Sequence, residues 1–220
     1  MKTLLLIFTL KKMPILSWSS HDELNLKPKS KTIIYLIIGL ILFGLGETLL
    51  VTSNIGVSPW FVLHQGLSFH TGYSIGVTTF IVSIIVLFFW IPLKQKPGIG
   101  TILNTILISI VVDISLPYLP TPEDFILQLF QVIIGVIIVG LGSGFYLIAN
   151  LGPGSRDGLM TGIQKKTQLP FALIRALIEL SAVALGWYLG GIVGIGTIIY
   201  ALGIGPLVSF GMFFVGKYFK

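Results

Sequence analysis

The sequence predicts an all-α membrane protein with six transmembrane helices, built from two inverted three-helix repeats that each carry a short non-spanning half-helix. Three observations predict this fold: the composition, six apolar segments of spanning length, and the similarity of the two halves. Of the 220 residues, 54% are hydrophobic and 10% are charged, and the mean hydropathy is +0.97. Soluble domains carry roughly 25% charged residues. A soluble domain of this length cannot hide so much apolar surface, so the composition indicates a membrane protein.

Six segments are long and apolar enough to span a bilayer. The hydrocarbon core is about 30 Å thick and a helix rises about 1.5 Å per residue, so a span needs roughly 20 apolar residues. Charged residues, Gly or Pro bound each segment. The predicted spans are Thr32–Ser53, Tyr73–Leu93, Gly98–Leu116, Phe125–Ala149, Pro170–Leu189 and Gly194–Val215.

The positions of Lys and Arg predict the orientation, because positively charged short segments stay on the cytoplasmic side. Three connections, 54–72, 117–124 and 190–193, contain no Lys or Arg. Apart from Arg175, the basic residues lie in the alternate segments and at both ends, which predicts that both termini lie in the cytoplasm of a cell membrane. Among them are Lys11, Lys12, Lys27, Lys29, Lys31, Lys94, Lys96, Arg156, Lys165, Lys166, Lys217 and Lys220.

The chain accordingly divides into a cytoplasmic leader (1–31), a first repeat (32–116), an outer loop (117–124), a second repeat (125–216) and a cytoplasmic tail (217–220). The leader begins with an apolar run that ends at Leu10, but no small-residue cleavage site follows it. We therefore expect the leader to be retained rather than cleaved as a secretory signal. Met13 is an alternative start.

The internal repeat emerges when the sequence is shifted against itself by 96 positions. Gly44-Leu45-Gly46 then falls on Gly140-Leu141-Gly142, and Asn54 and Gly56 fall on Asn150 and Gly152. The run 98–102 (GIGTI) falls on 194–198, which has the same five letters. Apolar composition alone does not align Gly and Asn in this way, so the pattern indicates duplication. Because each unit holds an odd number of spans, the second unit is expected to be inverted, as in many secondary transporters.

Each unit contains, between its first and second spans, a segment too short to cross the membrane. Both segments begin with Asn-x-Gly and predict a bend followed by about three helical turns. Ser58 and Ser155 are expected helix caps, Pro59 suits the first helical position, and Asp157 complements the helix dipole. Gly66 and Gly162 are expected helix stops. Such a half-helix lies either in the membrane interface or re-enters the bilayer, and the sequence leaves this open.

The amino ends of the half-helices are the candidate site, because free N–H groups there bind anionic or polar groups. On this interpretation six residues surround a solute path: Asn54, Ser58, Asn150, Ser155, Arg156 and Asp157. The alternative is that they are caps, with Arg156 as a cytoplasmic anchor.

The second of these segments also carries a recognisable motif. Residues 150–162 (NLGPGSRDGLMTG) resemble the Gly-x-Gly-x-Arg-Asp-Gly-Leu-Met signature of the YczE/YyaS/YitT family of bacterial membrane proteins. The resemblance covers roughly 34–214. It implies a multi-pass membrane protein and implies little about activity. The first unit has Pro59-Trp60-Phe61 where the second has Ser155-Arg156-Asp157, so the halves are expected to differ in role.

Ionisable residues inside the predicted spans are further candidates, because each costs at least about 2.5 kcal/mol to insert at mid-helix. Arg175 and Glu179 stand four residues apart and are expected to pair with each other. Glu47 follows Gly44-x-Gly46, which allows another helix backbone to approach, and it has no partner on its own helix. It either binds a proton or cation, or pairs with Arg175. Asp113 is expected to face the outer water.

His64 and His70 are expected to be surface residues of the outer connection. The chain has no cysteine, which excludes disulfides and thiolate chemistry, and we predict no metal or cofactor. It also lacks the zinc-protease, serine-hydrolase and P-loop motifs, so an enzyme is not expected.

Two functional classes remain. The first is a permease for a small polar or anionic solute, whose partners are the lipid bilayer and that solute. The second is a non-transporting accessory or regulatory protein that binds a cytoplasmic partner. The basic residues form no stripe typical of nucleic-acid binding, and the sequence leaves the oligomeric state open. A permease predicts polar groups that converge between the halves, whereas an accessory protein predicts a dry bundle.

Overall fold

The structure, a computed structural model, describes residues 14–219. The apolar run at the start of the leader lies outside the described residues. The described part folds into eight helices: α2 (Ser30–Ser53), α3 (Pro59–Thr71), α4 (Ile75–Trp90), α5 (Ile99–Ser115), α6 (Phe125–Ala149), α7 (Ser155–Thr167), α8 (Phe171–Tyr188) and α9 (Ile195–Tyr218). No strand occurs among residues 14–219, so the predicted all-α class is confirmed.

The helices follow the predicted elements closely, but the number of spans is less clear-cut than six. Four helices, α2, α6, α8 and α9, are long and apolar enough to cross a membrane. Helices α3 and α4 meet at an angle of 114° and together count as a fifth candidate span, while α5 has only 17 residues. The structure therefore supports four or five spans by length.

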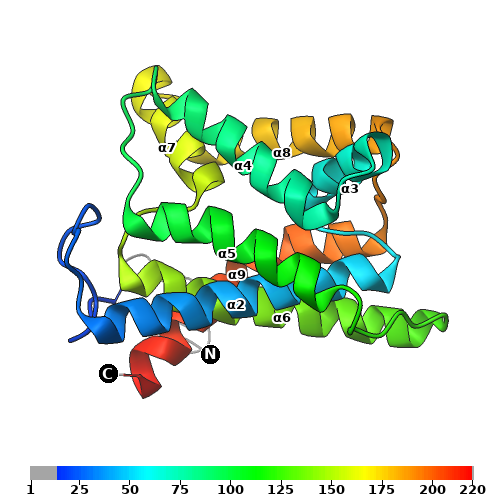
Figure 1. The fold of residues 1–220 in the computed structure, drawn as a ribbon, viewed down its shortest axis with the longest axis horizontal. Helices are drawn as coiled ribbons and strands as arrows, with labels where there is room; N and C mark the ends of the chain where they lie inside the picture. The colour runs from blue at the N-terminus through cyan, green and yellow to red at the C-terminus, as the bar shows by residue number, and fades with distance from the viewer. Residues whose placement is uncertain (1–13, 220) are drawn as a thin grey trace.

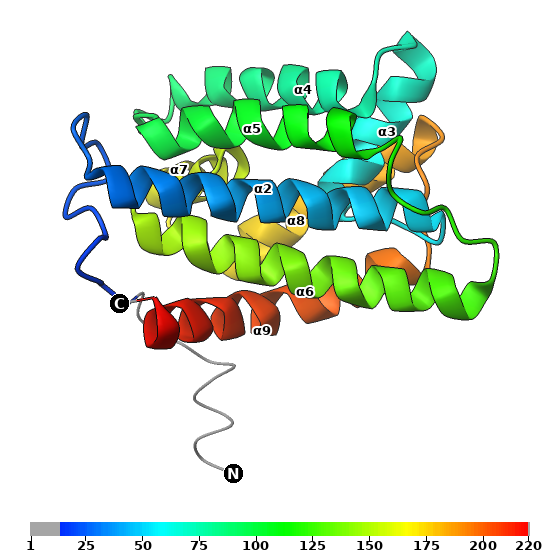
Figure 2. The ribbon, with the colours of Figure 1, turned by 60° about the horizontal axis from the view of Figure 1, so that its bottom comes forward.

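Helices α2 and α6 form the centre of the bundle, with α5 beside α2 and α9 beside α6 (Figure 2). Helices α4 and α8 lie in a second layer, and all six run roughly along the long axis of the molecule, with α4 tilted (Figure 1). The short helices lie toward opposite ends, α3 where α2 ends and α7 where α6 ends (Figure 1). Each short helix packs mainly against the other unit, α3 on α8 and α7 on α4.

Glycines bring the two central helices into backbone contact. A Cβ atom on Gly39 would lie 2.7 Å from the carbonyl oxygen of Gly142, and one on Gly46 would lie 2.7 Å from that of Gly135. A shift of 96 positions exchanges these two contacts, since Gly39 corresponds to Gly135 and Gly46 to Gly142. The Gly39–Gly142 and Gly46–Gly135 contacts between α2 and α6 are therefore equivalent under this shift.

Large apolar side chains cover much of the outer surface. Phe88, Phe130, Leu180 and Leu202 are all more than 60% exposed. In water such a surface would promote association, whereas hydrocarbon solvates it. The exposed apolar residues and the apolar helices support a location in the membrane.

The described part of the leader packs across one end of the bundle. Trp18 is 1% exposed, and its indole N–H donates to the carbonyl oxygen of Phe219 at the end of α9. The Ser20 amide donates to the Ala149 carbonyl oxygen at 3.1 Å, and the Asn150 side chain donates to the Ser20 carbonyl oxygen at 2.8 Å. Residues 14–29, which we name the strap, thus connect α6 and α9.

Several local predictions were wrong. Gly66 and Gly162 do not end the short helices, which continue to Thr71 and Thr167. Both glycines instead allow close packing, Gly66 against Gly186 and Gly162 against Leu93. The cap of α7 is Gly154 rather than Ser155, which is the first helical residue.

His64 is fully buried rather than a surface residue. Its ring Nδ1 lies 2.8 Å from the Thr79 hydroxyl. His64 lies in α3, which packs against α4 and α8 instead of forming an outer loop. His70 is exposed, as predicted. Asp113 is partly buried and accepts hydrogen bonds from the Ser74 hydroxyl at 2.5 Å and the Gly76 amide at 2.7 Å, so it fixes the start of α4.

Candidate functional site

A cavity of about 300 Å³ lies where the two units meet. All eight helices of the described part contribute to its lining. The polar lining residues are Ser58, Thr79, Ser83, Asn104, Ser143, Tyr146, Ser155, Arg156, Asp157, Arg175, Glu179 and Tyr200. Apolar residues, among them Phe43, Ile108, Ile204 and Val208, form the rest of the wall. The cavity therefore combines charged groups with an apolar surface.

Two equivalent bends direct the short helices toward this cavity. Asn54 and Asn150 adopt left-handed conformations, with φ of 57° and 51°, and end α2 and α6. Gly56 and Gly152 follow with φ of 117° and 106°, values that favour glycine. The sequence pattern Asn-x-Gly thus produces the same bend twice.

Each bend is held by the opposite unit. The Gly196 amide at the start of α9 donates to the Ile55 carbonyl oxygen at 2.9 Å. The Gly100 amide at the start of α5 donates to the Leu151 carbonyl oxygen at 2.7 Å. The repeated GIGTI run supplies both donors, so this run positions the half-helix of the other unit. As a result, the amino ends of α3 and α7 both line the same cavity.

Arg156 is the most distinctive residue of the cavity. Its guanidinium carbon lies 5.0 Å from the centroid of the Trp60 ring and 5.8 Å from that of Phe61. Among residues 14–219 it forms no hydrogen bond and no ion pair, so its donors are unused by the described protein. Trp60 is the residue that a shift of 96 positions places on Arg156. The two equivalent positions therefore contact each other.

The neighbours of Arg156 in α7 hold the helix in place. The Ser155 carbonyl oxygen accepts a hydrogen bond of 2.9 Å from the indole Nε1 of Trp90. One carboxylate oxygen of Asp157 accepts a hydrogen bond of 2.8 Å from the Tyr146 hydroxyl. Ser155 is buried, whereas Asp157 is exposed. Asp157 lies in the first turn of α7, as predicted.

Glu47 is fully buried and joins the two units. One of its carboxylate oxygens accepts a hydrogen bond of 2.7 Å from the Ser58 hydroxyl, and the other accepts one of 3.1 Å from the Tyr200 hydroxyl. Ser58 precedes α3 in the first unit, and Tyr200 lies on α9 in the second. Ser58 therefore stands at the expected cap position, but its side chain binds Glu47 instead of capping the helix.

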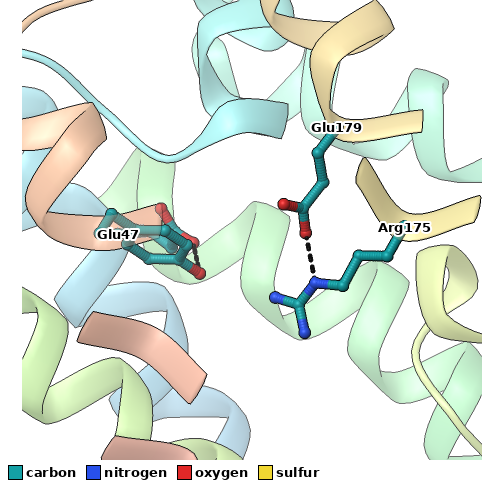
Figure 3. A network of polar contacts seen from close by, with 4 residues as sticks. Glu47, Arg175 and Glu179 are labelled. Atoms are coloured by element: carbon teal, nitrogen blue, oxygen red, sulfur yellow. Dashed lines mark hydrogen bonds and ion pairs between the residues drawn. The ribbon is translucent and has the colours of Figure 1, made fainter. Parts of the chain in front are cut away.

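Arg175 and Glu179 form the predicted ion pair on α8, with 2.8 Å between Nε and Oε1. Figure 3 shows this pair apart from Glu47, and no contact joins Glu47 to Arg175. The alternative in which Glu47 pairs with Arg175 was therefore wrong. The reason is that Arg175 has a carboxylate on its own helix, and Glu47 has two hydroxyl partners.

The two asparagines of the candidate site do not line the cavity. Asn54 is exposed, and the Asn150 side chain binds the strap at Ser20. They end helices and shape the bends, which was the structural alternative for these residues. Four of the six predicted residues, Ser58, Ser155, Arg156 and Asp157, do line the cavity, together with Arg175 and Glu179.

Sequence reasoning missed the aromatic members of the site, Trp60, Tyr146 and Tyr200. Aromatic residues in apolar segments carry no distinctive signal, because they resemble core residues. The repeat offset was a usable signal for Trp60, since it pairs that residue with Arg156. Among residues 14–219, no group of three or more His, Cys, Asp or Glu side chains is placed to hold a metal ion.

Comparisons with known proteins agree with the membrane character of the chain. It is 38% identical to an uncharacterized protein of Haemophilus influenzae over 198 aligned residues, and this alignment covers 90% of each chain. It is 33% identical to the uncharacterized membrane protein YczE of Bacillus subtilis over 176 aligned residues, and this alignment covers 79% of this chain and 82% of YczE. The uncharacterized protein YyaS of Bacillus subtilis is 26% identical over 190 residues, 84% of this chain and 94% of YyaS.

No solved structure matches the chain significantly. The relatives YczE and YyaS confirm the resemblance that the Arg-Asp-Gly-Leu-Met motif indicated. The family pattern covers residues 30–212, from the first residue of α2 to within α9. The chain therefore belongs to the family of unknown function DUF6198.

Proposed function

We propose that this protein is a permease of the cell membrane for a small polar or anionic solute, which binds in the cavity between the two units. The observation that carries the proposal is Arg156, a guanidinium that lines a cavity of about 300 Å³ and has no acceptor among residues 14–219. A guanidinium without a protein partner is costly to maintain inside a bundle. A solute that accepts its hydrogen bonds accounts for it. We propose no enzymatic reaction and no cofactor.

Six spans in two inverted units, with both termini in the cytoplasm, complete the proposal. The segments that carry Lys and Arg, at the start of α2 and in the α4–α5 and α7–α8 connections, lie at one end of the molecule (Figure 1). Helices α4 and α5 are about 24–26 Å long at 1.5 Å per residue, somewhat shorter than the hydrocarbon core. Local thinning of the bilayer accommodates such a mismatch at modest cost.

Inversion is supported by the paired contacts. The Gly196–Ile55 and Gly100–Leu151 hydrogen bonds exchange under the 96-residue shift, as do the glycine contacts of α2 and α6. Short helices α3 and α7 approach the cavity from opposite ends. Solute sites of inverted-repeat transporters lie between the halves and use half-helix amino ends, which is the arrangement proposed for this cavity.

The accessory-protein alternative predicted a dry, closed bundle with its polar chemistry on the cytoplasmic face. The charged lining of the cavity favours the permease. The two classes are separated by function: an accessory protein binds its cytoplasmic partner and moves no solute.

A solute screen tests the proposal. The full chain is purified in detergent, and its melting temperature is measured with a library of small acids, zwitterions and polar neutral compounds. A ligand at 100 times its Kd stabilises the folded state by about 2.7 kcal/mol. Compounds that raise the melting temperature are then tested for uptake into liposomes that contain the protein. The expected result is saturable uptake that Arg156→Gln abolishes, with Lys166→Gln on the exposed end of α7 as the charge-matched control. Binding without uptake, or no binding at all, would refute the permease.

Single cysteines test the topology, since the chain has none. Cysteines at the exposed positions Thr121 and Val193 should react with an impermeant thiol reagent from outside. Cysteines at Gln95 and Gln164 should react only after the membrane is permeabilised. A reversal at either pair would refute the six-span arrangement.

A further inference from the structure

We propose that the solute is a small zwitterion of the α-amino acid class with an aliphatic side chain. Its carboxylate binds Arg156, and its ammonium group faces the free carboxylate oxygens of Asp157 and Glu179. This inference rests on the proposed function and specifies its solute. It follows from four features of the cavity: the unused donors, the unused acceptors, the charge balance and the apolar wall.

The unused donors belong to Arg156 and Trp60, which both line the cavity. Arg156 donates to no residue between 14 and 219, and its guanidinium carbon lies over the rings of Trp60 and Phe61, 5.0 and 5.8 Å from their centroids. Stacking on aromatic rings leaves the planar edge of a guanidinium free, and that edge matches a carboxylate in bidentate geometry. Trp60 also lines the cavity. It is only 8% exposed, and its Nε1 has no acceptor among the described residues.

The first turns of the short helices add backbone donors. No side chain caps α3 or α7, because the Ser58 hydroxyl is bound to Glu47 and the cap residue of α7 is Gly154. The free N–H groups of a first helical turn favour an anionic group. Both helix starts line the same cavity, and Arg156 lies in the first turn of α7, so two helices, α3 and α7, define the binding position of a carboxylate.

The unused acceptors lie nearby. One oxygen of Asp157 binds the Tyr146 hydroxyl, and one oxygen of Glu179 binds Arg175. The second oxygen of each carboxylate has no donor among residues 14–219. Both residues line the cavity and interact electrostatically with Arg156. A primary ammonium group supplies three donors, and two free carboxylate oxygens are suitable acceptors for it.

Charge balance decides between the solute classes. Two guanidiniums, Arg156 and Arg175, and two carboxylates, Asp157 and Glu179, line the cavity. A simple anion would add a further negative charge beside these carboxylates, and like charges in a low-dielectric site repel strongly. A simple cation would leave Arg156 unpaired and lie close to it. A zwitterion pairs Arg156 and leaves the net charge of the site unchanged.

The apolar wall selects the side chain. Ile108, Leu147, Ile204 and Val208 line the cavity from α5, α6 and α9. A volume of about 300 Å³ is at the lower end of small-molecule sites, which range from roughly 300 to 1,000 Å³. The walls therefore suit a short aliphatic group better than a large aromatic or a second charged group.

Matched probes test the inference on the full-length protein in lipid nanodiscs. L-alanine, L-valine and L-leucine are compared by calorimetry with 4-methylpentanoate, which is leucine without its amino group, and with isopentylamine, which is leucine without its carboxylate. At least one of the amino acids should bind, and each one-charge analogue should bind at least about tenfold more weakly than leucine, since a charge-assisted hydrogen bond is lost.

Variants assign the two ends of the solute. Arg156→Lys keeps the positive charge and loses the planar bidentate donor. The variant should therefore bind leucine more weakly than the unmodified protein does, and it should not bind 4-methylpentanoate more tightly. Glu179→Gln should reduce the ratio of the affinity for leucine to the affinity for 4-methylpentanoate, because one acceptor of the ammonium group is lost. Glu123→Gln, on an exposed loop residue, is the matched control and should change neither affinity.

Each other outcome overturns the inference. If 4-methylpentanoate binds as tightly as leucine, the site is an anion site, and the proposed permease stands without the zwitterion. If isopentylamine binds as tightly, the site is a cation site. If none of the five probes binds, the amino-acid class is excluded, and the uptake screen of the proposed function then decides separately whether the protein transports any solute.

Discussion

Replacing Glu47 distinguishes its observed hydrogen bonds from an ion pair with Arg175. The carboxylate is fully buried and accepts hydrogen bonds from Ser58 and Tyr200. Glu47→Gln keeps the volume and one acceptor oxygen, and its amide N–H can donate to the second hydroxyl, since hydroxyls also accept. Two neutral hydrogen bonds then replace two charge-assisted ones, and the burial of a charge is removed. We expect a net cost of no more than about 1 kcal/mol.

Glu47→Ala should be much more damaging. Both hydroxyls would lose their partner, and a buried unsatisfied group costs about 1–3 kcal/mol. The missing carboxylate would also leave a void. We therefore expect the free energy of unfolding to fall by about 3–5 kcal/mol, several times the effect of Glu47→Gln.

Reversible unfolding in micelles measures these changes, and the double variant with Arg175→Gln supplies the decisive comparison. Glu47 and Arg175 share no hydrogen-bond partner, so their effects should add to within about 0.5 kcal/mol. If Glu47→Gln instead costs about 3–5 kcal/mol and Arg175→Gln recovers much of it, the two residues form a buried ion pair. That result would refute the hydrogen-bond account of Glu47.

Three further substitutions test the packing around the cavity. A Cβ atom on Gly158 would lie 2.0 Å from the buried ring of Trp90. Gly158→Ala should therefore lower the free energy of unfolding by about 1–3 kcal/mol. An unchanged melting temperature would contradict this contact. Trp18→Ala should cost about 3–5 kcal/mol and expose the strap to limited proteolysis, whereas Trp18→Phe should cost only about 1 kcal/mol for the lost hydrogen bond. Trp60→Arg should lower the melting temperature strongly, and the double variant with Arg156→Trp should recover part of that decrease. If the double variant shows no recovery, the two positions are not interchangeable.

The helices were predictable wherever a long apolar segment ended at a clear signal. Helix α6 has the predicted bounds, because Asp124 caps its start with its side chain and Asn150 ends it in a left-handed conformation. Helix α4 is shorter than predicted, since the chain leaves the helix after Trp90 and turns before Lys94, which has φ of 53°. Hydrophobicity continues beyond Trp90, so it could not locate this end.

The site was predictable in part because helix starts have a sequence pattern and tertiary contacts do not. Ser58, Arg156 and Asp157 were found from the Asn-x-Gly bends and the polar residues that follow. The partners of Glu47 were not found, because Tyr200 lies 153 positions away in an apolar helix. His64 was misplaced for a related reason: the segment around it reads as an outer connection, but α3 folds back against α8 and buries it.

The duplication that the repeated sequence pattern predicts gives a reason why only one of the two equivalent positions carries an arginine. Arg156 and Trp60 occupy equivalent positions and lie 5.0 Å apart, measured from the guanidinium carbon to the ring centroid. Two identical units would place two arginines there, with a repulsion of about 3 kcal/mol at 5 Å and an effective dielectric constant of about 20. An aromatic partner replaces that repulsion with a cation–π attraction of about 0.5–2 kcal/mol. On the hypothesis of duplication, one arginine at these two meeting positions is therefore more stable than two, which favours an arginine in one unit and an aromatic residue in the other.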